Sequence, residues 1–239
     1  MRLHQLTLSN PMTSHRGIGV LLSAVLLAAL STPANAQYTG ATTYLGSYPS
    51  TAPTKPSDLE ELVTEMKKGG YVIVLRHGAT NADQADTDPF HLDNIGAQRL
   101  LSEKGRDVAK RVGDSFRTLG IPLGKVYSSQ FNRATETAQL VSGKPPTTTP
   151  DLTEGGLVVS PTENARRAKV LKTLAAVVPE AGSNTLIVTH KPNILDAFGE
   201  DWFASKEGEA SVFKPDGSNN LVLIARVQAT DWIRAGGGQ

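Results

Sequence analysis

The chain contains no cysteine and carries almost no net charge, which is +1 over 239 residues. The absence of cysteine excludes disulfide bonds, thiolate metal sites, a cysteine nucleophile and a cysteine-linked lipid anchor. The near-neutral balance lacks the excess of positive charge that would indicate binding to nucleic acid or to an anionic membrane surface. The remaining composition, 39% hydrophobic and 20% charged, is that of a globular chain with a length that suits about one domain.

The chain also lacks an apolar run long enough to span a membrane. The apolar run at residues 18–30 is about 13 residues long, shorter than the ~20 that a membrane-spanning helix needs. Arg16 precedes this run, and Ala34-Asn35-Ala36 follows it with small residues where a signal peptidase would cleave. We therefore predict that residues 1–36 are a cleaved signal peptide. The protein would then be periplasmic or secreted, with no membrane span after cleavage.

Two further regions follow the predicted signal peptide. Residues 37–57 are rich in Thr, Ser, Pro and Gly and have no apolar periodicity, so we expect a flexible leader. Residues 58–239 show structured patterning and are expected to form one domain. A start at Met1 and an alternative start at Met12 both leave this division unchanged.

Strand-like and helix-like segments alternate within the predicted domain. Strands are predicted at residues 71–75, 125–127, 185–189 and 221–227. Helices are predicted at 58–69, 102–119, 132–141 and 162–178, and a further helix begins after His190. Buried strands that alternate with helices pair in parallel and are covered by the helices. We therefore predict the α/β class, as a three-layer α/β/α sandwich with a mainly parallel central sheet. Ligands in such sheets bind beyond the carboxyl ends of the strands.

Two histidines and two arginines fall at these strand ends. Arg76 and His77 follow the first strand, His190 follows the third, and Arg133 begins the helix after the second. Arginine presents forked donors that match an oxyanion, so phosphate is the ligand that this set favours. A neutral imidazole can attack phosphorus while the other groups stabilise the developing negative charge. This chemistry requires no metal and no other cofactor.

The residues around these side chains resemble the motifs of the histidine phosphatase superfamily, the phosphoglycerate mutase-like proteins. Residues 75–80, Leu-Arg-His-Gly-Ala-Thr, are similar to the Arg-His-Gly motif, residues 128–138 to the second signature, and Thr189-His190 to the third. The resemblance extends over about residues 70–232. It favours a small exported member of the mutase-like branch, because the phytase-like branch has an acid where this chain has Lys191.

The resemblance implies a role for each matching residue. His77 would be the nucleophile that becomes phosphorylated. Arg76, Thr80, Arg133 and His190 would bind the substrate and its phosphoryl oxygens.

A general acid is also implied, as a carboxylic acid between the second arginine and the last strand of the site. Glu154 fits this place best, with Glu163 as the second choice and Asp151 as the third. An asparagine that is common a few residues beyond the first motif corresponds to Asp83 here, which leaves that contact open.

These features predict an exported phosphomonoesterase of the metal-independent, acid type that works through a phosphohistidine on His77. The expected partner is a small phosphorylated substrate, with envelope sugar phosphates among the candidates, and the expected assembly is a monomer or dimer. Two alternatives are a non-catalytic pseudo-phosphatase that binds phosphorylated ligands and a phosphohistidine protein phosphatase. A phosphoglycerate mutase is disfavoured because export would separate it from its glycolytic substrate.

Overall fold

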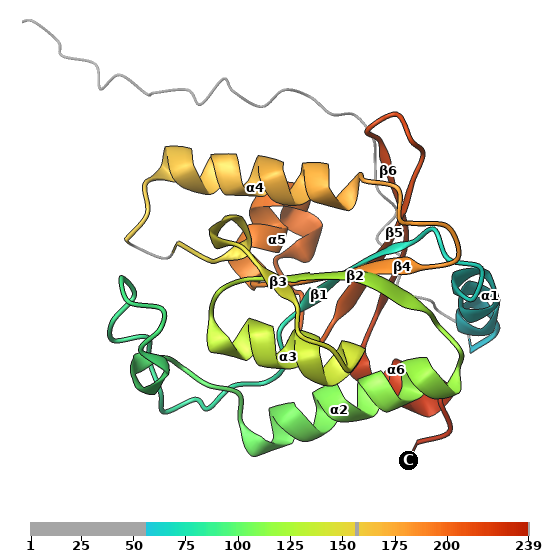
Figure 1. Ribbon diagram of the computed structural model, residues 1–239, viewed down its shortest axis with the longest axis horizontal. Coiled ribbons are helices and arrows are strands. Elements are labelled where there is room, and N and C mark those ends of the chain that lie inside the picture. Colours follow the sequence, from blue (N-terminus) through green and yellow to red (C-terminus); the bar gives the residue numbers. More distant parts are fainter. Residues whose placement is uncertain (1–55, 156–157, 239) are drawn as a thin grey trace, which may run out of the picture. The chain divides into compact units, whose positions relative to one another are not determined.

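The computed structural model describes residues 56–155 and 158–238 (Figure 1). The predicted signal peptide and most of the predicted leader lie outside the described residues. The first helix, α1, runs from Pro56 to Met66, so the last two residues of the predicted leader belong to it. Proline suits this first position because its fixed φ matches a helix and its missing N–H would have no partner there.

The described strands form one six-stranded sheet. They are β1 (Val72–Arg76), β2 (Leu123–Ser128), β3 (Thr147–Thr148), β4 (Asn184–Thr189), β5 (Ala210–Pro215) and β6 (Leu221–Val227), in the order β3-β2-β4-β1-β5-β6. The first four strands pair in parallel. β5 and β6 extend the sheet in the antiparallel direction. The predicted mainly parallel sheet is therefore confirmed.

Helices cover both faces of the sheet. Besides α1, they are α2 (Glu103–Thr118), α3 (Asn132–Ser142), α4 (Pro161–Ala175), α5 (Lys191–Phe198) and α6 (Ala229–Ala235), with short 3-10 turns at Ile95–Ala97, Pro150–Leu152 and Glu200–Trp202. Figure 1 shows α4 and α5 on one face and α2, α3 and α6 on the other, which gives the predicted three layers. None of the helices in the described part of the chain is both long and apolar enough to cross a membrane.

The central strand β1 contributes to two separate hydrophobic cores. Val72 and Val74 pack in the core beneath α4 and α5, whereas Ile73 and Leu75 pack in the core beneath α2, α3 and α6. A strand that is buried on both faces needs apolar residues at every position, which explains its continuous apolar sequence.

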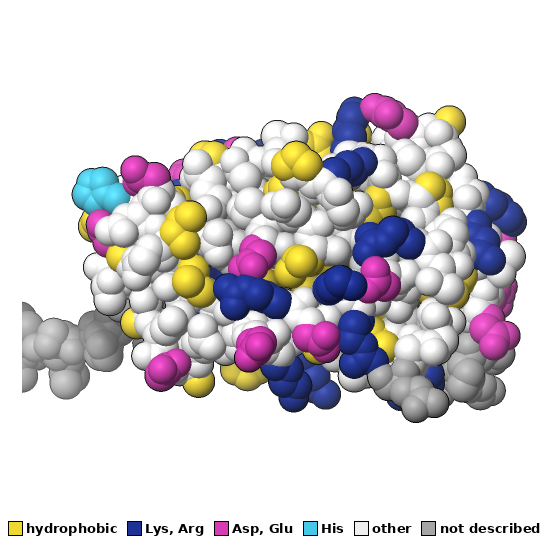
Figure 2. Space-filling model, turned by 60° about the horizontal axis from the view of Figure 1, so that its bottom comes forward, with side chains coloured by type: hydrophobic (Ala, Val, Ile, Leu, Met, Phe, Trp, Pro, Cys, Tyr) yellow, Lys and Arg dark blue, Asp and Glu magenta, His cyan; other side chains and the backbone are white. Residues whose placement is uncertain are grey.

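On the face that Figure 2 shows, Lys and Arg side chains are interspersed with Asp and Glu side chains.

Four elements differ from the sequence prediction. β3, β5 and α6 were not predicted, and the helix predicted over 162–178 ends at Ala175. Val177 and Val178 follow this end, and Pro179 comes next. The residue before a proline is disfavoured in the helical conformation, and β-branched residues are weaker helix formers, so the helix ends early.

Candidate functional site

The pairing of β1 with β4 brings His77 and His190 together. Arg76 lies opposite Thr189 in the register, so each histidine is the first residue after its strand. The His77 amide donates to the Thr189 carbonyl over 3.1 Å, which continues the pairing by one residue. The centroids of the two imidazole rings are 5.1 Å apart. The two predicted histidines therefore share one site at the carboxyl edge of the sheet.

The backbone fixes the tautomer of His77. Its Nδ1 lies 2.8 Å from the carbonyl oxygen of Gly78, which can only accept, so Nδ1 carries the proton in the neutral ring. This leaves Nε2 with its lone pair. Burial lowers the pKa of His77 well below its ordinary value, and the neighbouring His190, Arg133 and Arg76 lower it further. Since the side chain is only 2% exposed, the neutral nucleophilic form is the favoured one.

Arg133 lies in the first turn of α3 and is completely buried. Its Nη1 donates to Asp86 Oδ1 over 2.9 Å and to the Arg99 carbonyl over 3.3 Å. Its Nη2 donates to Glu154 Oε1. The guanidinium also lies 4.1 Å from the centre of the Phe131 ring. Two carboxylates thus hold the arginine that was predicted to bind the phosphoryl group.

His190 is completely buried beside this arginine. Its Nε2 lies 2.7 Å from Ser129 Oγ, and its Nδ1 lies 3.4 Å from Glu154 Oε1. Within the described part of the chain, Nδ1 makes no hydrogen bond. Burial lowers the pKa of His190 well below its ordinary value, with further lowering by Arg133, Arg99 and Arg76. A neutral ring is again favoured.

Of the three carboxylic acids proposed as the general acid, the structure places Glu154 against Arg133 and His190. Glu163 instead lies in the first turn of α4, where Arg166 and Arg167 bind it and lower its pKa to about 2. Such a carboxyl would be ionised at any working pH and could not donate a proton.

Asp151, the third choice, also contacts Arg166. Its ion pair is therefore with a residue of α4 and not with either of the two site histidines. Asp83, the open position beyond the first motif, is exposed in the loop after β1.

Arg76 and Thr80 line the more open side of the site. Nη1 of Arg76 donates to the Ser205 carbonyl over 2.7 Å, and its Nη2 lies 3.6 Å from Glu207 Oε1. The Thr80 hydroxyl donates to the same Glu207 oxygen over 3.3 Å. Nε of Arg76 is buried without a hydrogen-bond partner among the described residues.

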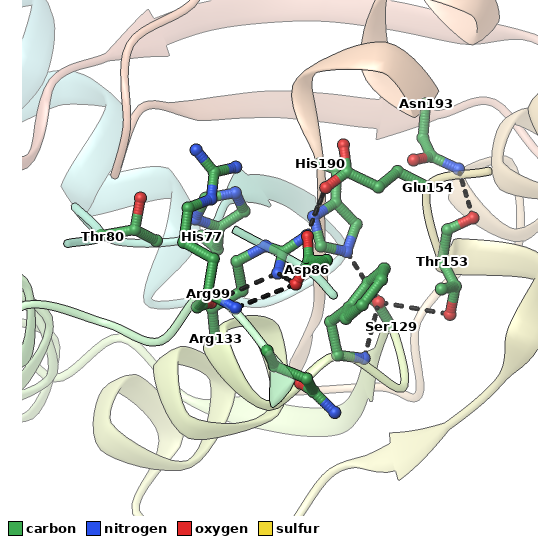
Figure 3. A network of polar contacts seen from close by, with 12 residues as sticks. His77, Thr80, Asp86, Arg99, Ser129, Arg133, Thr153, Glu154, His190 and Asn193 are labelled. Carbon is green, nitrogen blue, oxygen red and sulfur yellow. Dashed lines mark hydrogen bonds and ion pairs between the residues drawn. The ribbon is translucent and has the colours of Figure 1, made fainter. Parts of the chain in front are cut away.

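Three residues of the site were missed by the sequence analysis: Asp86, Arg99 and Glu207. Asp86 accepts from the Arg99 amide over 2.9 Å as well as from Arg133. The Arg99 side chain is close enough to His190 and Arg76 to lower the pKa of each. Figure 3 shows His77, Arg99, Arg133, His190 and Glu154 pointing into one space. The only sequence signal for these residues was their charge, in loops without periodicity.

The assembled site combines two neutral imidazoles with three arginines and three carboxyl groups, those of Asp86, Glu154 and Glu207. Guanidinium groups bind tetrahedral oxyanions, and a buried imidazole with a free Nε2 can act as a nucleophile. Among the described residues, no group of three or more His, Asp and Glu side chains is arranged to hold a metal ion.

Comparisons with known proteins agree with this arrangement. Residues 72–175 match the model of the histidine phosphatase superfamily, branch 1. Over 85 residues the chain is 38% identical to the mitochondrial serine/threonine-protein phosphatase Pgam5 of Drosophila grimshawi, and equally to that of Drosophila virilis. Each alignment covers 36% of this chain and 26% of the relative, so the chain matches about a quarter of the length of these relatives.

Solved structures of low sequence identity are also similar. One is the protein histidine phosphatase SixA complexed with tungstate, with a TM-score of 0.47 and 19% identity over 67% of this chain and 98% of that chain. Another is a phosphoserine phosphatase mutant from Entamoeba histolytica in complex with phosphoserine, with a TM-score of 0.49 and 16% identity at the same coverage.

Proposed function

We propose that this chain, whose residues 72–175 match the histidine phosphatase superfamily model, is a member of that superfamily and hydrolyses phosphate monoesters through a phosphohistidine on His77. The observation that carries this proposal is the bond between His77 Nδ1 and the Gly78 carbonyl, which leaves Nε2 unprotonated beside the arginines. A neutral nucleophile among fixed positive charges is what attack on a phosphoryl dianion requires.

In the first step, Nε2 of His77 attacks phosphorus, and the P–N bond forms as the bond to the ester oxygen breaks. Arg76, Arg133 and His190 bind the phosphoryl oxygens, with Arg99 as a further source of positive charge. Glu154, when protonated, gives its proton to the departing alkoxide, so that a neutral alcohol leaves.

In the second step, water attacks the phosphohistidine from the side that the alcohol has left. The Glu154 carboxylate takes a proton from this water as the P–N bond breaks. Inorganic phosphate leaves, and His77 returns to its neutral form. We propose that the reaction is independent of metal, since the arginines supply the positive charge at the phosphoryl oxygens.

We further propose that the enzyme acts outside the cytoplasm, on small phosphate esters that include envelope sugar phosphates. Support for export comes from the apolar run and small residues of positions 1–36. The mature protein isolated from its native host should begin at Gln37, and N-terminal sequencing checks this. Relatives described as serine/threonine-protein phosphatases also support including phosphoserine peptides in a substrate screen.

The test is hydrolysis of p-nitrophenyl phosphate in EDTA by the wild type and by His77→Ala. We expect release of p-nitrophenol by the wild type alone. Persistent activity in His77→Ala would overturn the phosphohistidine mechanism. Failure of both proteins to hydrolyse any ester, with retained binding of phosphate, would instead favour the pseudo-phosphatase.

A further inference from the structure

A third carboxylate, Glu207, lies at the open side of the site. Its Oε1 is 3.6 Å from Nη2 of Arg76 and accepts a hydrogen bond from the Thr80 hydroxyl over 3.3 Å. Both of these residues belong to the predicted phosphate-binding set. The proposed mechanism gives Glu207 no role, although its charge lies within the reach of any bound ester.

The loop that carries Glu207 is bound to the backbone of the nucleophile's segment. The Gly208 amide donates to the carbonyls of Arg76 and His77, and the Glu209 carbonyl accepts from the Arg76 amide over 3.0 Å. On the other side of Glu207, the Ser205 carbonyl accepts from the Arg76 side chain. Bonds on both sides of Glu207 hold its backbone at the site, so its charge stays near the substrate even if the side chain changes rotamer.

The exposure of the side chains shows which way the substrate must lie. His77, Arg133 and His190 are at most 2% exposed, whereas the side chains of Arg76 and Glu207 are 18% and 30% exposed. The phosphoryl group belongs at the buried end, next to the nucleophile. The alcohol part of the ester must therefore extend toward solvent, on the side where Glu207 lies.

Glu207 differs in this respect from the other two carboxylates of the site. Asp86 and Glu154 each bind the buried guanidinium of Arg133, so both carboxyl groups are directed inward. Glu207 has a longer ion pair with a more exposed arginine. Its negative charge is therefore the one that a group beyond the phosphoryl moiety would meet.

We propose that Glu207 is a specificity-determining residue that selects esters whose alcohol part carries no negative charge near the ester oxygen. Phosphorylated hydroxy acids would be poor substrates, and phosphorylated neutral polyols would be good ones. This inference rests on the proposed phosphatase function and specifies its substrate class. Repulsion of the wrong ligand is a common source of specificity.

A matched pair of esters tests this proposal. 3-Phosphoglycerate and glycerol 3-phosphate have the same three-carbon skeleton. The first carries a carboxylate at the position where the second carries a hydroxymethyl group. For the wild type, kcat/KM should be higher for glycerol 3-phosphate. In Glu207→Gln, which keeps an acceptor for Thr80, the ratio of the two values should fall by about fivefold or more, since about fivefold is the effect of two unit charges about 4 Å apart in water. The control Glu200→Gln, at an exposed glutamate in the preceding turn, should leave the ratio unchanged.

Binding of the two esters to variants that cannot turn them over tests the role of Glu207 independently of the proposed phosphatase activity. Isothermal titration of both esters to His77→Ala and to His77→Ala/Glu207→Gln should show the same shift in the ratio of Kd values. Absence of hydrolysis by the wild type together with this binding shift would refute the phosphatase and support the role of Glu207. A ratio that Glu207→Gln leaves unchanged in both measurements, or a wild type that prefers 3-phosphoglycerate, would overturn the proposal.

Discussion

At the scale of single residues, the three histidines of the described region lie in opposite electrostatic surroundings. His77 and His190 are buried beside arginines, and the pKa of each is lowered well below its ordinary value. His91 is exposed and bonded to Asp88 over 2.8 Å, and this carboxylate raises its pKa. A lowered pKa keeps a ring neutral as the pH falls, whereas a raised pKa makes it take up a proton earlier.

We therefore expect only His91 of these three to titrate between pH 7.5 and 5.5. Imidazole NMR shifts, assigned through single histidine substitutions, measure this directly, and the nitrogen shifts should show the proton of His77 on Nδ1. A midpoint near 6.5 for His77 would contradict the proposed neutral nucleophile.

A second prediction at this scale concerns the proton that Glu154 supplies. Glu154→Gln should lose about 10²-fold or more in kcat on alkyl phosphates, because an alkoxide leaves only with a proton. Loss on p-nitrophenyl phosphate should be much smaller, since p-nitrophenolate is a stable anion. Rates over a series of esters with leaving groups of different pKa check this, with Glu163→Gln as the control. Equal loss on all esters of the series would show that Glu154 does not donate the proton.

At the scale of elements, the N-terminus of α2 supports the loop that follows His77. Ser102 caps this helix, and its amide donates to the Ala79 carbonyl over 2.9 Å. A Cβ on Gly105, in the first turn, would lie 2.0 Å from this same carbonyl oxygen. Only glycine allows the helix to approach the loop so closely.

Gly105→Ala should therefore displace the loop that carries the nucleophile. We expect a loss of about 1–3 kcal/mol in the free energy of unfolding, the usual cost of overpacking, together with reduced kcat/KM in the protein that remains folded. Gly96→Ala is the control, because its Cβ would meet only ordinary contacts at 3.8 Å. Chemical denaturation and steady-state kinetics measure both effects, and equal behaviour of the two variants would argue against the close approach.

The elements that could be predicted from sequence are those with a strong local pattern. β1 and β4 are buried on both faces and have continuous apolar runs, and α2 shows a clear apolar period with a capping serine. β5 contains Ser211 and Lys214 and ends at Pro215, and α6 has only seven residues, so neither has a pattern that differs from a loop. Their formation depends on pairing and packing with distant segments.

The site residues follow the same division. His77 and His190 could be predicted because each directly follows a strand in a recognisable motif, and Arg133 because it lies in the first turn of the helix after a strand in such a motif. Asp86, Arg99 and Glu207 lie in loops whose paths are determined by tertiary contacts, such as the bond between Asp86 and Arg133. Their charge was visible in the sequence, but their position at the site was not.

At the scale of the whole molecule, the buried neutral histidines link stability to pH. In the unfolded chain His77 and His190 have ordinary pKa values near 6.5, and in the folded protein these values are lower. As the pH falls below about 6.5, the unfolded chain takes up protons first, and the folded state loses stability. The largest slope for each histidine is about 1.4 kcal/mol per pH unit.

We therefore expect the free energy of unfolding, measured with denaturant, to fall between pH 7 and 5.5. His190→Asn should flatten this dependence, whereas His91→Gln should not, since the pKa of His91 is shifted in the other direction. A pH dependence that His190→Asn leaves unchanged would show that its imidazole does not contribute to this linkage.

The place of β1 within the sheet also determines when the protein can fold. β1 pairs with β4 on one side and with β5 on the other, and Val72 meets Thr185 and Phe213, both more than one hundred residues later in the chain. Contacts of such long sequence separation are slow to form. A growing polypeptide that ends before β4 has no partner for the strand that precedes His77. The nucleophile is therefore in place only after β4 and β5 have paired with β1, so the appearance of activity reports on completed folding.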